Sequence, residues 1–241
     1  GGERASDDAG GAQEPGTSGE AAGGAFGRRT VEVEDGAETG DIAAVATGNC
    51  SDEDGWALHN ASRVRQFFGK LGWQDDRSDL DVSVTLADNA LHGAQTLPLS
   101  FLDRPRESYT YPDVNENRLA FIVAKGSRFL GDSQLIDANV YYRRFRNTNV
   151  SSNVNDDFGV TDPATGVAET NPATNDRATI DESSYGGGVQ WTARTQFAGH
   201  AHQLAIGAGA NGGITHFAQA SQPAAFTSDR GTIGTGAYAD T

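Results

Sequence analysis

The sequence lacks several features that whole classes of protein require. Cys50 is the only cysteine among 241 residues, so no internal disulfide and no cysteine-cluster metal site can form. The longest apolar run, at residues 119–124, is far shorter than the roughly 20 residues of a membrane-spanning helix. Methionine is absent, and the first residues are not the basic start and apolar stretch of a secretory signal. We therefore expect a chain that has been processed or that is a piece of a longer one.

Positive charge is scarce as well. Lysine and arginine total 18 against 33 aspartates and glutamates, which gives a formal net charge of −15. A net charge of this sign repels the phosphates of nucleic acids and of anionic lipid headgroups. The composition therefore argues against a nucleic-acid partner.

What the sequence does have is alternation of apolar and polar residues with a period of two, while helical periodicity is nearly absent. Residues 1–16 are mostly Gly, Ala and acidic, and predict a flexible lead-in to a single all-β domain at residues 17–241. In the stretch 183–197, Trp191 falls on one face of a strand, and Gln190 and Arg194 fall on the other. Strands are predicted there and at residues 28–34, 41–50, 63–73, 78–87, 117–129, 134–146 and 202–217, with a fragment near the C-terminus.

The predicted connections alternate between short and long. Four are tight turns, at residues 35–40, 74–77, 130–133 and 198–201, and four are long polar loops, at residues 51–62, 88–116, 147–184 and 218–230. A loop of roughly forty residues is uncommon in a compact soluble domain. Long outer loops opposite short periplasmic turns are typical of outer-membrane barrels. Predicted strands of about 10–13 residues also suit a tilted membrane strand better than a soluble sheet.

Aromatic residues gather near both ends of the predicted strands. Those at the short-turn ends are Trp73, Phe129 and Phe197, and those near the long-loop ends are Tyr142, Phe145, Tyr185 and Phe217. Amphipathic rings are favoured at the headgroup level of a membrane. These seven residues are therefore predicted to form two membrane-interface belts.

An ordered set of short segments resembles the early barrel of TonB-dependent outer-membrane receptors. The segments are GGAFGRRTVEVEDG (23–36), DEDGW (52–56), FGKLGW (68–73), DLDVSVTLADN (79–89) and VYYRRFRNTNVSSNVNDD (140–157). The resemblance is strongest over residues 23–157 and continues to residue 241 as a rhythm of strands and loops. It implies an antiparallel up-and-down meander that forms part of a transmembrane β-barrel of about 22 strands.

The resemblance also implies a function. Receptors of this family take up a scarce ligand, most often a ferric siderophore, across the outer membrane of Gram-negative cells, and the TonB complex drives them through an N-terminal plug domain. About ten strands are predicted here, and no plug, TonB-contacting segment or terminal aromatic strand is found. We therefore expect an internal fragment of such a barrel, surrounded by outer-membrane lipid and lipopolysaccharide.

No constellation of residues predicts catalysis, a metal site or a cofactor. The acidic segments at 52–55 and 153–159 lack the acidic first ligand of a calcium loop. His200 and His202 lie in a predicted turn with no carboxylate nearby, and the glycine-rich segments lack the ending of a phosphate-binding loop. The sequence therefore predicts a protein that is not an enzyme and holds no metal.

Three arginines, Arg143, Arg144 and Arg146, lie near the outer end of one predicted strand. Strand alternation places Arg143 on the lumen face, and Arg194 belongs to the lumen set of its own strand. These two are the candidates for contact with an anionic ferric ligand. Arg144 and Arg146 have the opposite parity, and the cluster could instead contact lipopolysaccharide phosphates or acidic loops.

Two other functions stay open at this point. A passive porin-like barrel would need a closing number of strands, and ligand-independent conductance would favour it. A soluble, acidic β-sandwich acting as a binding module would bury the face of Trp191 as a protein core, and partition into detergent would argue against it.

Overall fold

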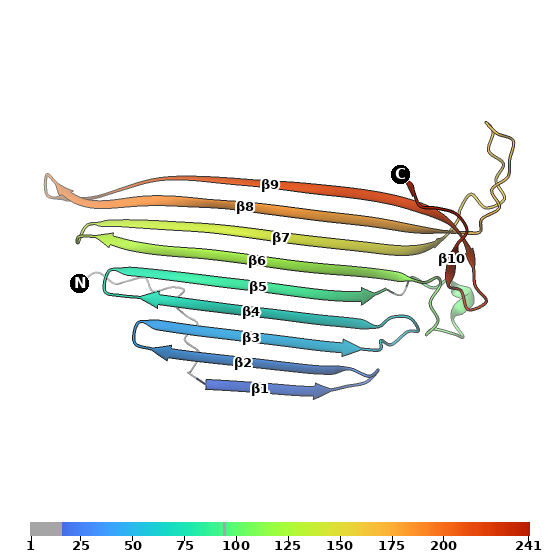
Figure 1. Ribbon diagram of the computed structural model, residues 1–241, viewed down its shortest axis with the longest axis horizontal. Helices are drawn as coiled ribbons and strands as arrows, with labels where there is room; N and C mark the ends of the chain where they lie inside the picture. Colours follow the sequence, from blue (N-terminus) through green and yellow to red (C-terminus); the bar gives the residue numbers. More distant parts are fainter. Residues whose placement is uncertain (1–15, 94) are drawn as a thin grey trace.

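The computed structural model describes residues 16–93 and 95–241, which form one antiparallel sheet (Figure 1). The strands lie side by side in chain order from β1 to β10, and β11 pairs with β9. A single 3₁₀ turn, η1 (Leu99–Phe101), lies between β5 and β6. The strands are β1 (Gly16–Gly23), β2 (Arg29–Thr39), β3 (Ile42–Glu53), β4 (Ser62–Gln74), β5 (Ser78–His92), β6 (Asp113–Leu130), β7 (Gln134–Val154), β8 (Ala173–Phe197), β9 (His200–Phe226), β10 (Thr232–Gly234) and β11 (Ala239–Asp240). The predicted all-β, up-and-down meander is confirmed.

Pairing between neighbouring long strands runs without a skipped residue. β8 and β9, for example, pair continuously from Ala173↔Ala224 to Phe197↔His200, and the pairs from β1 to β8 are equally regular. Because side chains alternate along each strand, an unbroken register carries the alternation across the sheet and gives it two uniform faces.

The face that carries Trp191 is apolar, and we call it the apolar face. Large side chains stand on it without a second layer of protein: Leu71 is 55 % exposed, Val140 58 % and Ile206 59 %. Its central residues are Phe67, Leu71, Trp73, Leu80, Val82, Val84, Leu86, Ile122, Ile136, Val140, Tyr142, Tyr185, Val189, Trp191, Leu204 and Ile206.

The opposite face is the polar face. It carries amide, hydroxyl and charged side chains along the same strands, among them Gln66, Lys70, Asp81, Ser83, Thr85, Lys125, Asn139, Gln190, Thr192 and Arg194. In the described residues no second sheet covers either face. The β-sandwich alternative is therefore wrong, since it needed the Trp191 face to be a protein core.

One end of the sheet, here called the turn end, has the short connections. Gly40, Gly131 and Gly199 adopt positive φ angles of 60°, 72° and 77° there, which a glycine tolerates without strain. In the β4–β5 turn, the Asp75 carboxylate accepts hydrogen bonds from the backbone N–H groups of Arg77 and Ser78 at 2.7 and 2.6 Å. Each hairpin reaches farther at this end than the one before it (Figure 1), as strands that tilt against a barrel axis do.

The other end, the loop end, differs from the sequence prediction. The loop predicted at 147–184 covers only 155–172, because β7 continues to Val154 and β8 starts at Ala173. The loop predicted at 88–116 shrinks to 93–112 for the same reason, and the turn predicted at 35–40 tightens because β2 runs to Thr39. These added strand residues are mostly polar and do not alternate regularly, so the ladder of backbone hydrogen bonds continues where the alternation that reveals a strand has stopped.

Buried residues concentrate at the loop end. Thr110, Ser152, Ala173 and Ala224 are fully buried there, where residues 95–112 pack against the ends of β7 and β10. The expected lead-in falls almost wholly on residues 1–15, which lie outside the described residues, and Gly16 already belongs to β1. In the described residues, no helix has the length and apolar character to cross a membrane.

Candidate functional site

Arg143 and Arg194, the two candidate ligand-binding residues, both lie on the polar face. The Arg143 guanidinium forms an ion pair with Glu182 at 2.6 Å and lies 5.0 Å from the centre of the Phe145 ring. Arg194 donates from Nε to Gln203 Oε1 at 3.3 Å. Arg143 pairs with Ser184, and ten residues of β8 at about 3.3 Å each separate Ser184 from Arg194. The structure therefore does not bring the two arginines together into one site.

Two other polar groups lie on the same face. Asp81 lies between Lys70 at 3.2 Å and Lys125 at 3.8 Å, so three neighbouring strands contribute to one charged cluster. Nearer the loop end, Asn147 donates to the side-chain oxygens of Asn115 and Asn117 at 3.0 and 2.8 Å. Sequence reasoning missed both groups, because their members lie far apart in the chain and only strand register joins them.

A shallow hollow of about 420 Å³ opens beside Tyr141 and Asn211 in the middle of the sheet. The Tyr141 hydroxyl donates to Asn211 Oδ1 at 3.2 Å across Gly186. A Cβ atom at Gly186 would lie 2.0 Å from that amide oxygen and 2.8 Å from the Tyr141 ring. The glycine therefore allows the ring and the amide to meet across β8.

Aromatic and charged side chains tie the loops together at the loop end. The ring of Tyr111 stacks on His59 with centroids 3.6 Å apart, and its hydroxyl donates to Asp229 Oδ2 at 2.5 Å. The Arg230 guanidinium lies 4.9 Å from the Phe101 ring and 4.6 Å from the Tyr109 ring. We call these six residues and their connections the loop cluster.

Contacts within the loop cluster also shift the pKa values of Asp229 and Tyr111. Hydrogen bonds from the hydroxyls of Thr227 and Tyr111 stabilise the Asp229 carboxylate and lower its pKa to about 2. The pKa of Tyr111 is raised, because its proton is held in the hydrogen bond to Asp229. Beneath the cluster, Ser152 Oγ lies 2.9 Å from Thr232 Oγ1 and donates to the Pro112 carbonyl at 2.8 Å. Polar contacts between segments distant in sequence thus hold the loop end together.

The register divides the seven predicted interface aromatics between the two faces. Trp73, Tyr142, Tyr185 and Phe197 lie on the apolar face, with Trp73 and Phe197 toward the turn end. Phe129, Phe145 and Phe217 lie on the polar face. A membrane-interface belt on the apolar face can therefore contain the first four only.

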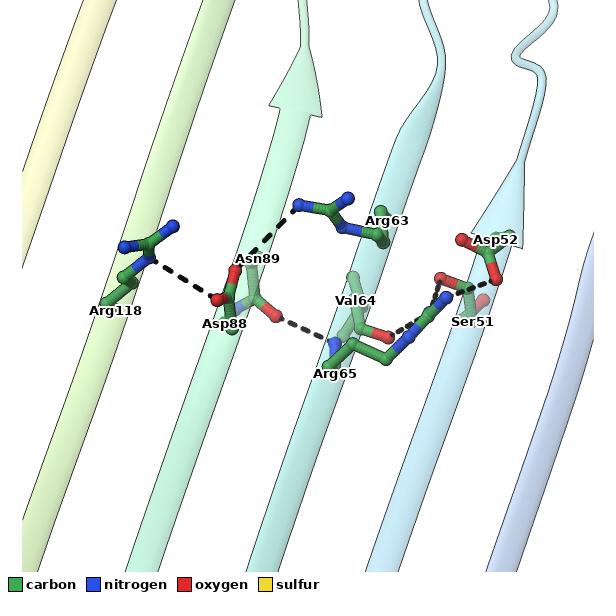
Figure 2. Close-up of polar contacts among 8 residues, drawn as sticks. All are labelled: Ser51, Asp52, Arg63, Val64, Arg65, Asp88, Asn89 and Arg118. Atoms are coloured by element: carbon green, nitrogen blue, oxygen red, sulfur yellow. Dashed lines mark hydrogen bonds and ion pairs between the residues drawn. The ribbon is translucent and has the colours of Figure 1, made fainter.

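Arg144 and Arg146 lie on the apolar face, opposite to Arg143. Arg144 binds both carboxylate oxygens of Asp181 at 2.9 Å. The cross-strand partner of Arg146 is Arg118 of β6. Arg63 and Arg65 of β4 lie beyond Asp88 of β5 from Arg118, a grouping that the sequence does not reveal (Figure 2). Among the described residues, no group of three or more His, Cys, Asp or Glu could hold a metal ion.

Comparison by sequence finds little. No protein-family model matches the chain, and no curated protein matches it.

Comparison with solved structures finds outer-membrane receptors and transporters with a β-barrel fold. The ferripyoverdine receptor of the outer membrane of Pseudomonas aeruginosa superposes with a TM-score of 0.65 and 15 % identity, over 94 % of this chain and 33 % of the receptor. The ferric citrate transporter FecA gives a TM-score of 0.64 and 10 % identity, over 92 % of this chain and 32 % of that one. The ferric-catecholate import receptor Fiu from E. coli K12 gives 0.61 and 10 %, over 95 % and 39 %.

The chain therefore spans about a third of the length of these solved structures. These neighbours are transport and import receptors rather than enzymes. The chain has the fold of the barrel of the TonB-dependent siderophore receptors of the outer membrane.

Proposed function

We propose that the chain is part of an outer-membrane receptor that takes up a ferric siderophore with energy from the TonB complex. The observation that carries the proposal is the two-faced sheet. An apolar face of exposed Leu, Val, Ile, Trp and Tyr side chains backs a face of amides, hydroxyls and charges along the same strands. Lipid outside and a watery or plugged lumen inside suit such a wall.

The fold supports uptake of a bulky ligand rather than simple porin behaviour. The solved structures that the chain superposes on are named as receptors for ferripyoverdine and ferric catecholates and as a transporter of ferric citrate. Receptor barrels of about 22 strands hold a plug in the lumen, whereas porins of 16–18 strands have an open channel. Contact with TonB through a plug domain is part of the proposal.

The polar face and the loops have separate roles in this proposal. The loops at 93–112 and 155–172 form the lid over the ligand, and the loop cluster holds the first of them against the ends of the strands. Arg143 and Arg194 lie on the lumen wall, where an anionic ferric complex would pass. Trp73 and Phe197 belong to the periplasmic interface belt, and Tyr142 and Tyr185 to the outer belt.

Iron uptake tests the proposal. The protein in its full natural length is expressed in a Gram-negative strain that lacks its own siderophore receptors, and uptake of ⁵⁵Fe is measured with a panel of siderophores. We expect uptake of at least one ferric siderophore that disappears when TonB is deleted. Uptake that is unchanged without TonB, together with ligand-independent conductance in a planar bilayer, would establish the passive porin instead.

A further inference from the structure

The apolar face ends, toward the loop end, in a band of arginines. Six arginines from the four strands β2, β4, β6 and β7 form it, and we call them the arginine belt: Arg29, Arg63, Arg65, Arg118, Arg144 and Arg146. Arg65, Asp88, Arg118, Arg146 and Asp181 are successive partners in a single cross-strand row from β4 to β8. Arg29, Asp52 and Arg63 are partners in the adjacent row.

Aspartates neutralise only part of the belt. Figure 2 shows Asp88 between two arginines, at 3.3 Å from Arg118 and 4.0 Å from Arg63, while Arg65 pairs with Asp52 at 2.6 Å. Arg144 belongs to a third row, next to that of Arg146. With Asp181 and Glu116, these three rows hold four acidic residues against six arginines. This patch is therefore positive on a chain whose formal net charge is −15.

Arg146 lies directly opposite another arginine of the belt. Its cross-strand partners are Arg118 on one side and Asp181 on the other. Asp181 is already bound by Arg144 through both oxygens, and in the described part of the chain Arg146 has no ion pair. Like charges directly opposite each other destabilise a sheet, so Arg118 and Arg146 would gain from an anion between them.

The surroundings of the belt indicate which anion fits. On the turn-end side the same face continues as Leu86, Val84, Ile122 and Val140, so a molecule bound at the belt would meet charge at one end and hydrocarbon at the other. Within the described residues, the loop carboxylates that form ion pairs are Asp103 and Glu107, and both do so with Arg104, outside the belt. The acidic loops are therefore not its partner there.

The two ends of the apolar face also differ. At the turn end, the register places Arg128, His200 and His202 on this face. The loop end has six arginines within three adjacent rows. An arginine guanidinium binds phosphate oxygens in a bidentate fashion. The asymmetry fits a membrane whose outer leaflet has the greater density of phosphate.

We infer that the arginine belt binds the phosphate groups of lipid A, the lipid portion of lipopolysaccharide, while the acyl chains lie along the apolar face below it. Arg118 and Arg146 hold one phosphate between them, and Arg63 and Arg144 flank the pair. The inference rests on the proposed function in one respect, because it needs the apolar face to lie against the outer leaflet.

Binding of purified lipids to the detergent-solubilised protein of full natural length tests the inference. Native mass spectrometry compares bisphosphorylated lipid A, the same lipid A after removal of both phosphates, and phosphatidylglycerol. We expect the loss of both phosphates to weaken binding at least about tenfold, since charge-assisted hydrogen bonds are lost. Equal binding of the two forms of lipid A, or equal binding of phosphatidylglycerol, would overturn the inference. Competition by inorganic phosphate alone at millimolar concentration would point to a site for free anions instead.

Variants then place the site. Arg118→Gln with Arg146→Gln is expected to reduce lipid A binding about tenfold, whereas Asp88→Asn is expected to increase it several-fold because it removes a competing carboxylate. Lys70→Gln with Lys125→Gln removes two positive charges from the polar face of neighbouring strands and should leave lipid A binding unchanged. Equal loss in both double variants would contradict the assignment to the belt. If the belt variant fails to fold, the comparison of lipids on the wild-type protein still decides the matter.

Iron uptake is scored separately, so the two proposals fail in different ways. A receptor that transports iron but does not discriminate lipid A phosphates would remove only the belt inference. A protein that binds lipid A through its phosphates but takes up no siderophore would remove only the proposed cargo.

Discussion

The two faces of the sheet are made by the same strands and differ in almost every property. In β7, Val140 on the apolar face is 58 % exposed with nothing packed on it, and its neighbour Asn139 is exposed on the polar face. In water such an apolar surface would be a liability, because large exposed apolar patches on soluble proteins lead to association. The contrast indicates that each face of the sheet is suited to a different environment, and that the sheet is not stabilised by a buried core.

A second contrast separates the sheet from the loop cluster. The sheet buries little side-chain volume, whereas the loop end holds fully buried polar residues such as Thr110 and Ser152. Each of these is hydrogen-bonded, with Thr110 Oγ1 donating to the Ser152 carbonyl at 2.5 Å. The sheet therefore depends on its surroundings for stability, while the loop end depends on its own hydrogen bonds.

The largest expected effect comes from placing a charge on either face of β7. Val140→Arg should lower the free energy of unfolding in lipid vesicles by about 2–4 kcal/mol, because an arginine near the bilayer midplane is not solvated. Asn139→Arg, one residue away, should change the free energy of unfolding by less than about 1 kcal/mol. Guanidinium titration followed by tryptophan fluorescence measures both variants. Equal losses in the two variants would mean that the faces do not meet different surroundings.

A smaller effect is expected where the protein supplies its own surroundings. Ser152→Ala removes the hydroxyl that contacts Thr232 and Pro112, and should destabilise the loop cluster by about 1–2 kcal/mol. Ser83→Ala on the polar face should stay within about 0.5 kcal/mol of the wild type. Hydrogen exchange of the backbone amides at Thr227 and Thr232 measures the opening of the cluster. Unchanged exchange in Ser152→Ala would show that the buried hydroxyl does not hold the loops.

The alternation of residues such as Trp191 and Gln190 predicted the strands and their two faces, because each strand has a period of two on its own. The order of the strands was implied by the resemblance to a barrel family. The strand ends beyond the apolar face were missed, since residues such as Asn147 and Thr148 are polar on both faces and give no alternation. The sequence suggested repulsion from anionic lipid on net charge alone. Net charge averages over the chain and hides a local excess of arginine.

Arg143 was correctly assigned to the polar face by parity, and Arg144 and Arg146 to the other. The cross-strand neighbour of Arg146 could not be predicted in the same way. Arg118 lies in a different strand, and only the β6–β7 register places the two arginines opposite each other. The same limit applies to Tyr111 and Asp229, which are joined across more than a hundred residues by the folding of loops without a repeating pattern.

Quenching by brominated lipid sharpens the comparison of the faces at the turn end. Trp73 lies on the apolar face and Phe129 on the polar face, both near short turns. With every other tryptophan replaced by phenylalanine, Trp73 should lose at least about half of its fluorescence in brominated lipid, as a ring in an interfacial belt does. Phe129→Trp, in a background without Trp73, should lose much less. Equal quenching at both positions would argue against a belt restricted to the apolar face.

The smallest expected effect is confined to the loop cluster and to acid. The pKa of Asp229 is lowered from its ordinary value of 3.8 to about 2, so its contribution to stability is complete above pH 3.8 and is lost as the pH falls through 2. Hydrogen exchange at Thr227 should therefore show constant protection from pH 7 to 5, after correction for the intrinsic rate, and a loss of protection between pH 4 and 2. Tyr111→Phe removes one of the two hydroxyls that stabilise the carboxylate, so the loss of protection should be smaller and should be complete at a higher pH. The β7 amide of Val140, which has no such carboxylate beside it, provides the control, because its protection should not follow the same curve. A transition that is identical in wild type and Tyr111→Phe would mean that the hydroxyl does not stabilise the Asp229 carboxylate and that other carboxylates govern the opening of the loops in acid.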